Sequence, residues 1–204
     1  MRCCEKCRPL NSARMFKSAA PVLHKRAVHA LLKQKQGCAG IEVGAGCLRN
    51  SLFLLKKKFK VTVLEVPGMD TRFPENFAMF RRRGGTFTSR LPKSRRFELA
   101  VATFVFETIC DRKLRAKIVR GVFESLNRSG CLVISARGPS DLVTAHEKGR
   151  HCSDGYLTPG YSFARSYTRS QLRRMLSRSG FRKVEFLHKN GTRSPELLHA
   201  LAWR

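Results

Sequence analysis

Apolar and polar positions along the chain follow two alternating patterns. Short apolar runs are typical of buried strands, and the chain carries them at residues 39–43, 60–66, 98–105 and 131–136. Between these runs, apolar residues recur every three or four positions, which is typical of a helix with one buried face. Such stretches cover residues 47–57, 74–83, 112–127 and 169–179. Alternating strands and helices predict an open, mostly parallel α/β sheet with helices on both faces.

The two ends of the chain depart from this alternation. Residues 183–188 and 196–203 are predicted to form strands, and the short turn-rich segment 189–195 between them makes these strands antiparallel neighbours. Residues 12–36 have the spacing of one or two basic helices, with Pro21 starting or kinking a helix. The chain therefore divides into a basic N-terminal tail with a helical segment and a main domain, residues 1–36 and 37–204.

A glycine turn, Gly44-Ala45-Gly46, follows the first predicted strand and precedes a helix. Glycine lets the backbone turn sharply and lets a ligand approach without a Cβ in the way. A pyrophosphate-binding loop would place a third glycine where this chain has Arg49. Glu42, just before the turn, also opposes a bound phosphate and suits a ligand with an amino group. The turn therefore favours S-adenosylmethionine, with its amino acid tail and sulfonium, over NAD.

A second acid, Glu65, stands at the end of the second predicted strand. An acid about 20 residues after such a glycine turn accepts hydrogen bonds from the ribose hydroxyls of a bound nucleoside. The alternative is a plain surface carboxylate at a strand end. The position of Glu65 after the glycine turn favours the ribose interpretation.

Three stretches carry a resemblance to a known family: IEVGAG (41–46), VTVLEV (61–66) and FELAVATFVFETI (97–109), the last followed by a helix and SGCLVISARG (129–138). In this order and spacing the chain resembles class I S-adenosylmethionine-dependent methyltransferases. The resemblance implies a seven-stranded Rossmann-like sheet whose last strand is antiparallel. It also implies S-adenosylmethionine as the cofactor, with the candidate contacts Glu42, Gly44, Ala45, Gly46, Glu65, Thr103 and Phe104.

The chain departs from the family pattern around the adenine. An acid is common in the family where this chain has Ala102, Thr103 and Phe104, and Ser89 and Arg90 stand where an acid would meet the adenine amino group. A tetrapeptide of the N/D-P-P-Y/F type is also missing after the fourth strand, which argues against methylation of a DNA base at an amino nitrogen.

Residues 137–167 form a long polar stretch after the fifth strand. A loop of this length is uncommon unless it is functional or disordered, and we expect a lid-like insertion over the substrate. The candidate bases in it are His146, His151 and Asp154, and the candidate substrate contacts are Arg137, Tyr156, Tyr161 and Tyr167. The alternatives are that the histidines are merely exposed and that Tyr167 packs beneath the following helix.

The net charge of +27, from 41 Lys and Arg against 14 Asp and Glu, exceeds what solubility needs. It favours an anionic partner such as nucleic acid, although a solvated basic face is the alternative. The positive charge is concentrated in residues 81–96 and 165–183, which contain no acid.

The cysteines and the hydropathy pattern suggest a cytoplasmic protein. No apolar run is long enough for a membrane span, and no secretory signal is visible, so we expect no membrane association. Four of the eight cysteines, Cys38, Cys47, Cys110 and Cys131, stand singly beside predicted core elements, which favours a reducing compartment. Cys3, Cys4 and Cys7 are clustered, but a zinc site usually takes two separated pairs, so we predict no metal.

These observations predict a methyltransferase whose acceptor is an unidentified anionic molecule or nucleic acid. Two alternatives stay open. The first is a methyltransferase for a small metabolite whose basic surface is incidental. The second is a non-catalytic nucleic-acid-binding protein on the same fold.

Overall fold

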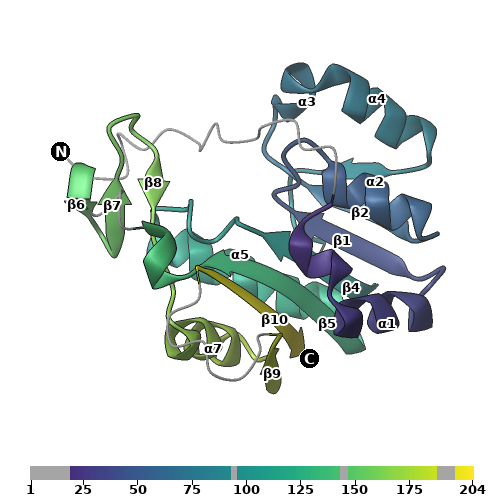
Figure 1. The fold of residues 1–204 in the computed structure, drawn as a ribbon. Coiled ribbons are helices and arrows are strands. Elements are labelled where there is room, and N and C mark those ends of the chain that lie inside the picture. Colours follow the sequence, from purple (N-terminus) through teal and green to yellow (C-terminus); the bar gives the residue numbers. More distant parts are fainter. Residues whose placement is uncertain (1–18, 93–95, 143–146, 188–195) are drawn as a thin grey trace.

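A seven-stranded sheet forms the centre of the computed structural model, which describes residues 19–92, 96–142, 147–187 and 196–204 (Figure 1). Its strands are β1 (Ala39–Val43), β2 (Lys60–Leu64), β3 (Thr86–Thr88), β4 (Phe97–Thr103), β5 (Leu126–Arg137), β9 (Lys183–Phe186) and β10 (Leu197–Trp203). They lie side by side in the order β3-β2-β1-β4-β5-β10-β9.

The pairing of the strands confirms the predicted topology. β1 is parallel to β2 and β4, β2 is parallel to β3, and β4 is parallel to β5. β10 is antiparallel to both β5 and β9. β1, β4 and the second half of β5 are almost entirely buried, because helices cover both faces of the sheet.

The helices are η2 (Pro21–His24), α1 (Arg26–Gln34), α2 (Arg49–Lys56), α3 (Met69–Arg72), α4 (Pro74–Arg82), α5 (Arg112–Ser125), η3 (Pro139–Leu142) and α7 (Arg169–Arg178). Successive residues of a strand point to opposite faces, and Leu99 and Val101 of β4 lie in one buried cluster while Ala100 and Ala102 lie in another. The first cluster includes residues of α1, α2 and α4, and the second includes residues of α5 and α7.

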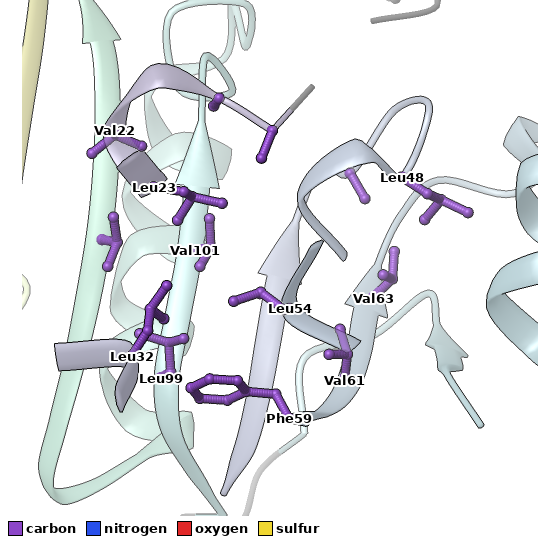
Figure 2. Packing of buried hydrophobic residues seen from close by; sticks show 14 of the residues in the cluster. Val22, Leu23, Leu32, Leu48, Leu54, Phe59, Val61, Val63, Leu99 and Val101 are labelled. Carbon is purple, nitrogen blue, oxygen red and sulfur yellow. The ribbon is translucent and has the colours of Figure 1, made fainter. Parts of the chain in front are cut away.

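Side chains from η2, α1 and α2 build the first cluster (Figure 2). Val22 and Leu23 of η2 lie close to Val101 of β4, and Leu32 of α1 lies near Leu99 (Figure 2). Burial of one such side chain contributes about 1.5–3 kcal/mol relative to exposure. The N-terminal helical segment is therefore part of the main hydrophobic core.

This N-terminal segment differs in detail from the predicted helices. Residues 1–18 lie outside the described residues, and with them the cluster of Cys3, Cys4 and Cys7. Pro21 starts a 3₁₀ turn, as its fixed φ favours, and extended backbone at Lys25 (ψ 138°) separates this turn from α1. Two short helices therefore stand where the sequence allowed one or two.

The segment 137–167 contains structure that the sequence pattern did not reveal. β6 (Arg150–Cys152), β7 (Gly155–Leu157) and β8 (Phe163–Ala164) form a separate three-stranded antiparallel sheet. In Figure 1 this small sheet lies at the opposite side of the molecule from α3 and α4. His146 lies outside the described residues, so its candidate role as a base stays a prediction.

Side chains cap the starts of two helices. Asp111 caps α5, and Thr168 and Gln171 form a capping box at the start of α7. Among the described residues, no helix combines the length and the apolar character needed to cross a bilayer.

Candidate cofactor site

The turn after β1 is built from left-handed backbone at alternate positions. Gly44, Gly46 and Leu48 have φ angles of 64°, 54° and 65°. At Gly44 and Gly46, glycine adopts this backbone without the steric cost of a Cβ, and the chain turns here from β1 into α2. The Gly44 N–H donates to the carbonyl of Leu64 at 2.9 Å, so the turn is fixed to the end of β2.

Gly44 also brings two loops at the carboxyl edge of the sheet into contact. A Cβ atom at this position would lie 2.8 Å from Cγ2 of Val105, in the loop after β4. Contacts below 3.0 Å do not occur between real Cβ atoms and their neighbours. Glycine is therefore required both for the positive φ and for the close approach of the loop.

Glu65 reaches back to this turn from the end of β2. Its Oε2 accepts a hydrogen bond from the Gly46 N–H at 2.9 Å, and its Oε1 accepts one from the Val66 N–H at 2.9 Å. Each carboxylate oxygen has a second lone pair, so Glu65 retains the capacity to accept hydrogen bonds from two hydroxyls. The structure thus brings Glu65 and the glycine turn together, as the ribose interpretation requires.

Glu42 has a different environment from Glu65. It is fully buried, its Oε1 accepts from Asn50 Nδ2 at 2.8 Å, and its Oε2 accepts from Ser51 Oγ. Asn50 also donates to Thr103 Oγ1 at 2.9 Å and accepts from the Ala20 N–H at 2.7 Å. Burial raises the pKa of Glu42 to about 7. Because α2 engages both carboxylate oxygens, Glu42 fixes the turn to α2, and this geometry favours an indirect role over the direct ligand contact predicted for it.

β4 ends at the same edge in a strained residue. Thr103 is buried with its hydroxyl bonded to Asn50, whereas Phe104 is half-buried and has a φ of 59°. The Phe104 N–H donates to Ser135 of β5 at 3.0 Å, which fixes this conformation. Left-handed backbone costs a residue with a Cβ roughly 1–2 kcal/mol, and such strain is concentrated at functional sites. This strain adds to the prediction that Phe104 lines the site.

Glu107 is a site residue that the sequence interpretation missed. Its side chain is 1% exposed and lies just after β4, where its Oε1 accepts from the Arg137 N–H at 3.2 Å. Its Oε2 has no hydrogen-bond partner among the described residues. Burial raises the pKa of Glu107 to about 7. An acid just after a buried parallel strand is a signal that could have identified it.

Tyr167 supports the loop that carries Glu107. It is 1% exposed, and its hydroxyl donates to the Phe106 carbonyl at 3.2 Å. The Arg165 guanidinium lies 4.1 Å from its ring centroid, and burial raises the pKa of the phenol to about 12. Packing against the loop takes the ring and the hydroxyl of Tyr167, which agrees with the alternative that this side chain is packed, and its contact with a substrate stays a prediction.

Asp154 is the centre of an ion-pair cluster. It lies 2.5 Å from Arg115 and 3.8 Å from Arg112, and it also pairs with Arg165. Burial alone would raise the pKa of Asp154, but the hydrogen bond from Arg115 and the charges of the three arginines hold it below its usual range. A carboxylate held in its ionised form takes up a proton poorly, so the candidate role of Asp154 as a general base is not supported.

The other candidates of the insertion lie nearer to solvent. His151 is exposed, with its ring 5.8 Å from that of Tyr156 across the β6–β7 pair. Tyr161 is 52% exposed. Arg137 forms an ion pair with Asp141 at 2.6 Å. The roles of these side chains in the site stay predictions.

Comparison with known proteins supports this description at the level of the fold. No family model and no curated protein sequence match the chain. Among solved structures, it is similar to the 1,6-didemethyltoxoflavin-N1-methyltransferase of Burkholderia thailandensis, with 17% identity over 88% of this chain and 77% of that one, and a TM-score of 0.66. A methyltransferase from Methanosarcina mazei matches at 18% identity over 92% and 98% of the two chains, with a TM-score of 0.67.

The chain has the class I methyltransferase fold. CcbJ of Streptomyces caelestis, another methyltransferase, matches at 15% identity over 86% of each chain, with a TM-score of 0.63. Within this methyltransferase fold, the glycine turn, Glu65 and Phe104 all lie at the carboxyl edge of the sheet. Open α/β sheets bind their ligands at this edge.

Proposed function

We propose that the protein is an S-adenosylmethionine-dependent methyltransferase whose acceptor is an anionic molecule, with nucleic acid as the favoured class. The observation that carries the proposal is the hydrogen bond from Gly46 to Glu65 at the carboxyl edge of a methyltransferase fold. It joins the glycine turn to a carboxylate with acceptor capacity left for hydroxyls.

The residues at this edge fit S-adenosylmethionine better than a dinucleotide. Glu65 would hold the ribose hydroxyls, and the backbone of residues 44–46 would lie against the amino acid tail. Two acids and Arg49 in place of a third glycine do not suit a pyrophosphate. When bound, S-adenosylmethionine supplies a methyl group on a positively charged sulfur, which is a good leaving group.

The chain's own residues would mainly provide proximity and orientation. Phe104 would line the site, and Glu107 would accept a proton from a hydroxyl acceptor, since a pKa of about 7 leaves it partly ionised at neutral pH. In the present conformation the Arg165 N–H donates to the Glu107 carbonyl at 3.1 Å, which ties the insertion to this loop.

The acceptor class rests on charge. The net charge of +27 favours a polyanion as the acceptor. A small acceptor would not require so basic a protein. A small-metabolite methyltransferase is the second candidate, because the similar Burkholderia enzyme was solved with the small molecule 1,6-didemethyltoxoflavin. We also propose a cytoplasmic location, which rests on the sequence pattern of single cysteines beside core elements, such as Cys47 and Cys131.

Isothermal calorimetry tests the proposal with S-adenosylhomocysteine, S-adenosylmethionine and NAD as ligands. We expect binding of the first two and none of NAD. Gly44→Arg should abolish this binding, because its side chain would fill the turn, and it should leave RNA binding in a filter assay unchanged. Absence of binding by the wild-type protein would contradict the proposal. Transfer of labelled methyl to total RNA or to a small-molecule extract then separates the two acceptor classes.

A further inference from the structure

A surface pocket lies far from the glycine turn, between the last turns of α1 and α2. Its volume is about 200 Å³, and it is lined by His29, Leu32, Lys33, Gln36, Lys56 and Lys57. Leu32 forms an apolar floor, and the rim is cationic or polar. We call this site the lysine pocket.

The two helices that line the lysine pocket, and the strands that follow them, carry no acidic side chain at their surface. Residues 19–41 and 43–64 contain no Asp or Glu. Glu42, which stands between them, is fully buried and bonded to α2. The basic residues of these elements therefore have no surface carboxylate of their own elements to neutralise them: Lys25, Arg26, Lys33, Lys35, Lys56, Lys57, Lys58 and Lys60.

The end of α2 carries a second, independent feature. The Lys58 N–H donates to Leu55 O at 2.9 Å and the Phe59 N–H donates to Leu54 O at 3.1 Å, which is the hydrogen-bond pattern of a Schellman motif. Its left-handed position is usually glycine, and α4 and α7 indeed end at Gly84 and Gly180 with positive φ. At the end of α2 it is Lys58, with a φ of 65°. The chain thus keeps a strained lysine beside the pocket where glycine would fit better.

The position of the lysine pocket relates it to the candidate cofactor site. α1 and α2 end just before β1 and β2, so the pocket lies at the amino edge of the sheet, whereas the glycine turn lies at the carboxyl edge. β1 has five residues, which places the two edges about 17 Å apart. Phosphates of one strand are about 3.4 Å apart along the axis, so about five nucleotides cover this distance.

We propose that the lysine pocket binds backbone phosphates of a nucleic acid and anchors the strand whose methylated position lies at the other edge of the sheet. Phosphate contacts of this kind position a nucleic acid without reading its sequence. Only the naming of the bound strand as methyl acceptor rests on the proposed function. A membrane is the less suitable partner, since the exposed large apolar residues of the described chain are Val66, Leu114 and Tyr161, and none belongs to α1 or α2.

Charge reversal in the pocket tests the proposal against a matched control. The pocket variant is Lys33→Glu with Lys56→Glu, and the control is Lys113→Glu with Lys117→Glu, at exposed positions of α5 on the other face of the sheet. Both variants have the same net charge. Fluorescence anisotropy with a labelled 20-nucleotide RNA should show about a tenfold or larger loss of affinity for the pocket variant only. Its slope of log K against log salt should fall by about 1.4, the value for two lost single-strand contacts.

Equal losses in the two variants would overturn the proposal, because affinity would then follow net charge alone. Inorganic phosphate at a concentration equal to that of the RNA phosphates should not release the RNA. Release would overturn the proposal, since the site would then bind free phosphate. The proposal would also be overturned if the pocket variant lost its binding to vesicles containing anionic lipid but kept its RNA affinity. S-adenosylhomocysteine binding, measured in parallel, is expected to be the same in all variants. If the wild-type protein did not bind S-adenosylhomocysteine, the proposed function would be contradicted and the RNA result would still stand.

Lys58→Gly separates binding from folding. Glycine relieves the left-handed strain, so the midpoint of thermal unfolding should rise by about 2–4 °C. RNA affinity should fall, because one cation beside the pocket is lost. A more stable variant with unchanged RNA affinity and salt slope would show that Lys58 has no part in binding.

Discussion

Glu42 and Glu65 are both acids at the glycine turn, but their surroundings give them different roles. Glu42 is buried and has both oxygens bonded to α2, which makes it part of the frame. Glu65 is half-buried and bonds only to backbone N–H groups. Of the two, Glu65 is the one with capacity to meet a ligand.

Glu65→Ala should weaken S-adenosylhomocysteine binding by about 1–3 kcal/mol, the range for hydrogen bonds to a charged group. Titration calorimetry measures this change. Glu75→Ala, at an exposed position in the first turn of α4, removes the same charge and should leave the affinity unchanged. Equal affinities for wild type and Glu65→Ala would remove Glu65 from the cofactor site.

Several site residues could be placed from the sequence, and others could not, for physical reasons. Glu65 and the glycine turn follow apolar strand runs, and parallel strands bring their carboxyl ends to one edge, so their proximity was predictable. The burial of Tyr167 and Glu107 depends on packing between distant segments, which no local pattern reports. The roles of Asn50 and Ser51 were hidden because their partner, Glu42, is itself buried.

At the scale of elements, long periodic segments were predictable and short ones were not. β4 and α5 extend over several turns or pleats, so their pattern stands out. β6, β7 and β8 have two or three residues each, too few to show a period. What holds this small sheet is an ion-pair cluster: Asp154 joins it to Arg112 and Arg115 of α5, and Arg165 closes the cluster from the chain after β8.

Asp154→Ala should therefore release the insertion and destabilise the protein. Arg115 is 4% exposed and would lose its ion pair, and leaving a buried charge unpaired costs about 3–5 kcal/mol. Urea denaturation gives the change in the free energy of unfolding, and limited proteolysis at the Arg and Lys residues of 147–165 reports the release. Asp141→Ala breaks a more exposed pair and should cost about 1 kcal/mol or less. If both variants had the same small effect, the cluster would not hold the insertion.

At the scale of the whole molecule, positive charge is divided unevenly between the two faces of the sheet. On the α5 and α7 side, part of it is used internally, since Arg115 and Arg165 pair with Asp154, and Arg173 lies 5.4 Å from the ring of Phe186. On the α1 and α2 side, no acid is present at the surface of residues 19–64. Net charge alone gives no such division, and the fold is what makes one face the better candidate for a polyanion.

Stability should depend on pH through the buried acid Glu107. Its pKa is raised from 4.5 to about 7 in the folded protein, so the folded state keeps a proton that the unfolded chain releases. The free energy of unfolding should therefore fall as pH rises from about 4.5 to about 7, and the full cost should be present above that. One pKa unit corresponds to about 1.4 kcal/mol, which places this cost at about 3 kcal/mol.

Glu107→Gln tests this dependence, because glutamine has the shape of the protonated acid and never ionises. We expect the variant and the wild type to differ little in urea denaturation at pH 5, and the variant to be more stable by about 2–3 kcal/mol at pH 8. The comparison cancels the pH dependence of the other groups, including Asp154, since both proteins share them. A difference that stays constant between pH 5 and pH 8 would mean that Glu107 does not titrate in this range, and the proposed proton acceptor near neutral pH would be lost with it. A difference that grows with pH would support a carboxyl group held ready to take up a proton beside the carboxyl edge of the sheet.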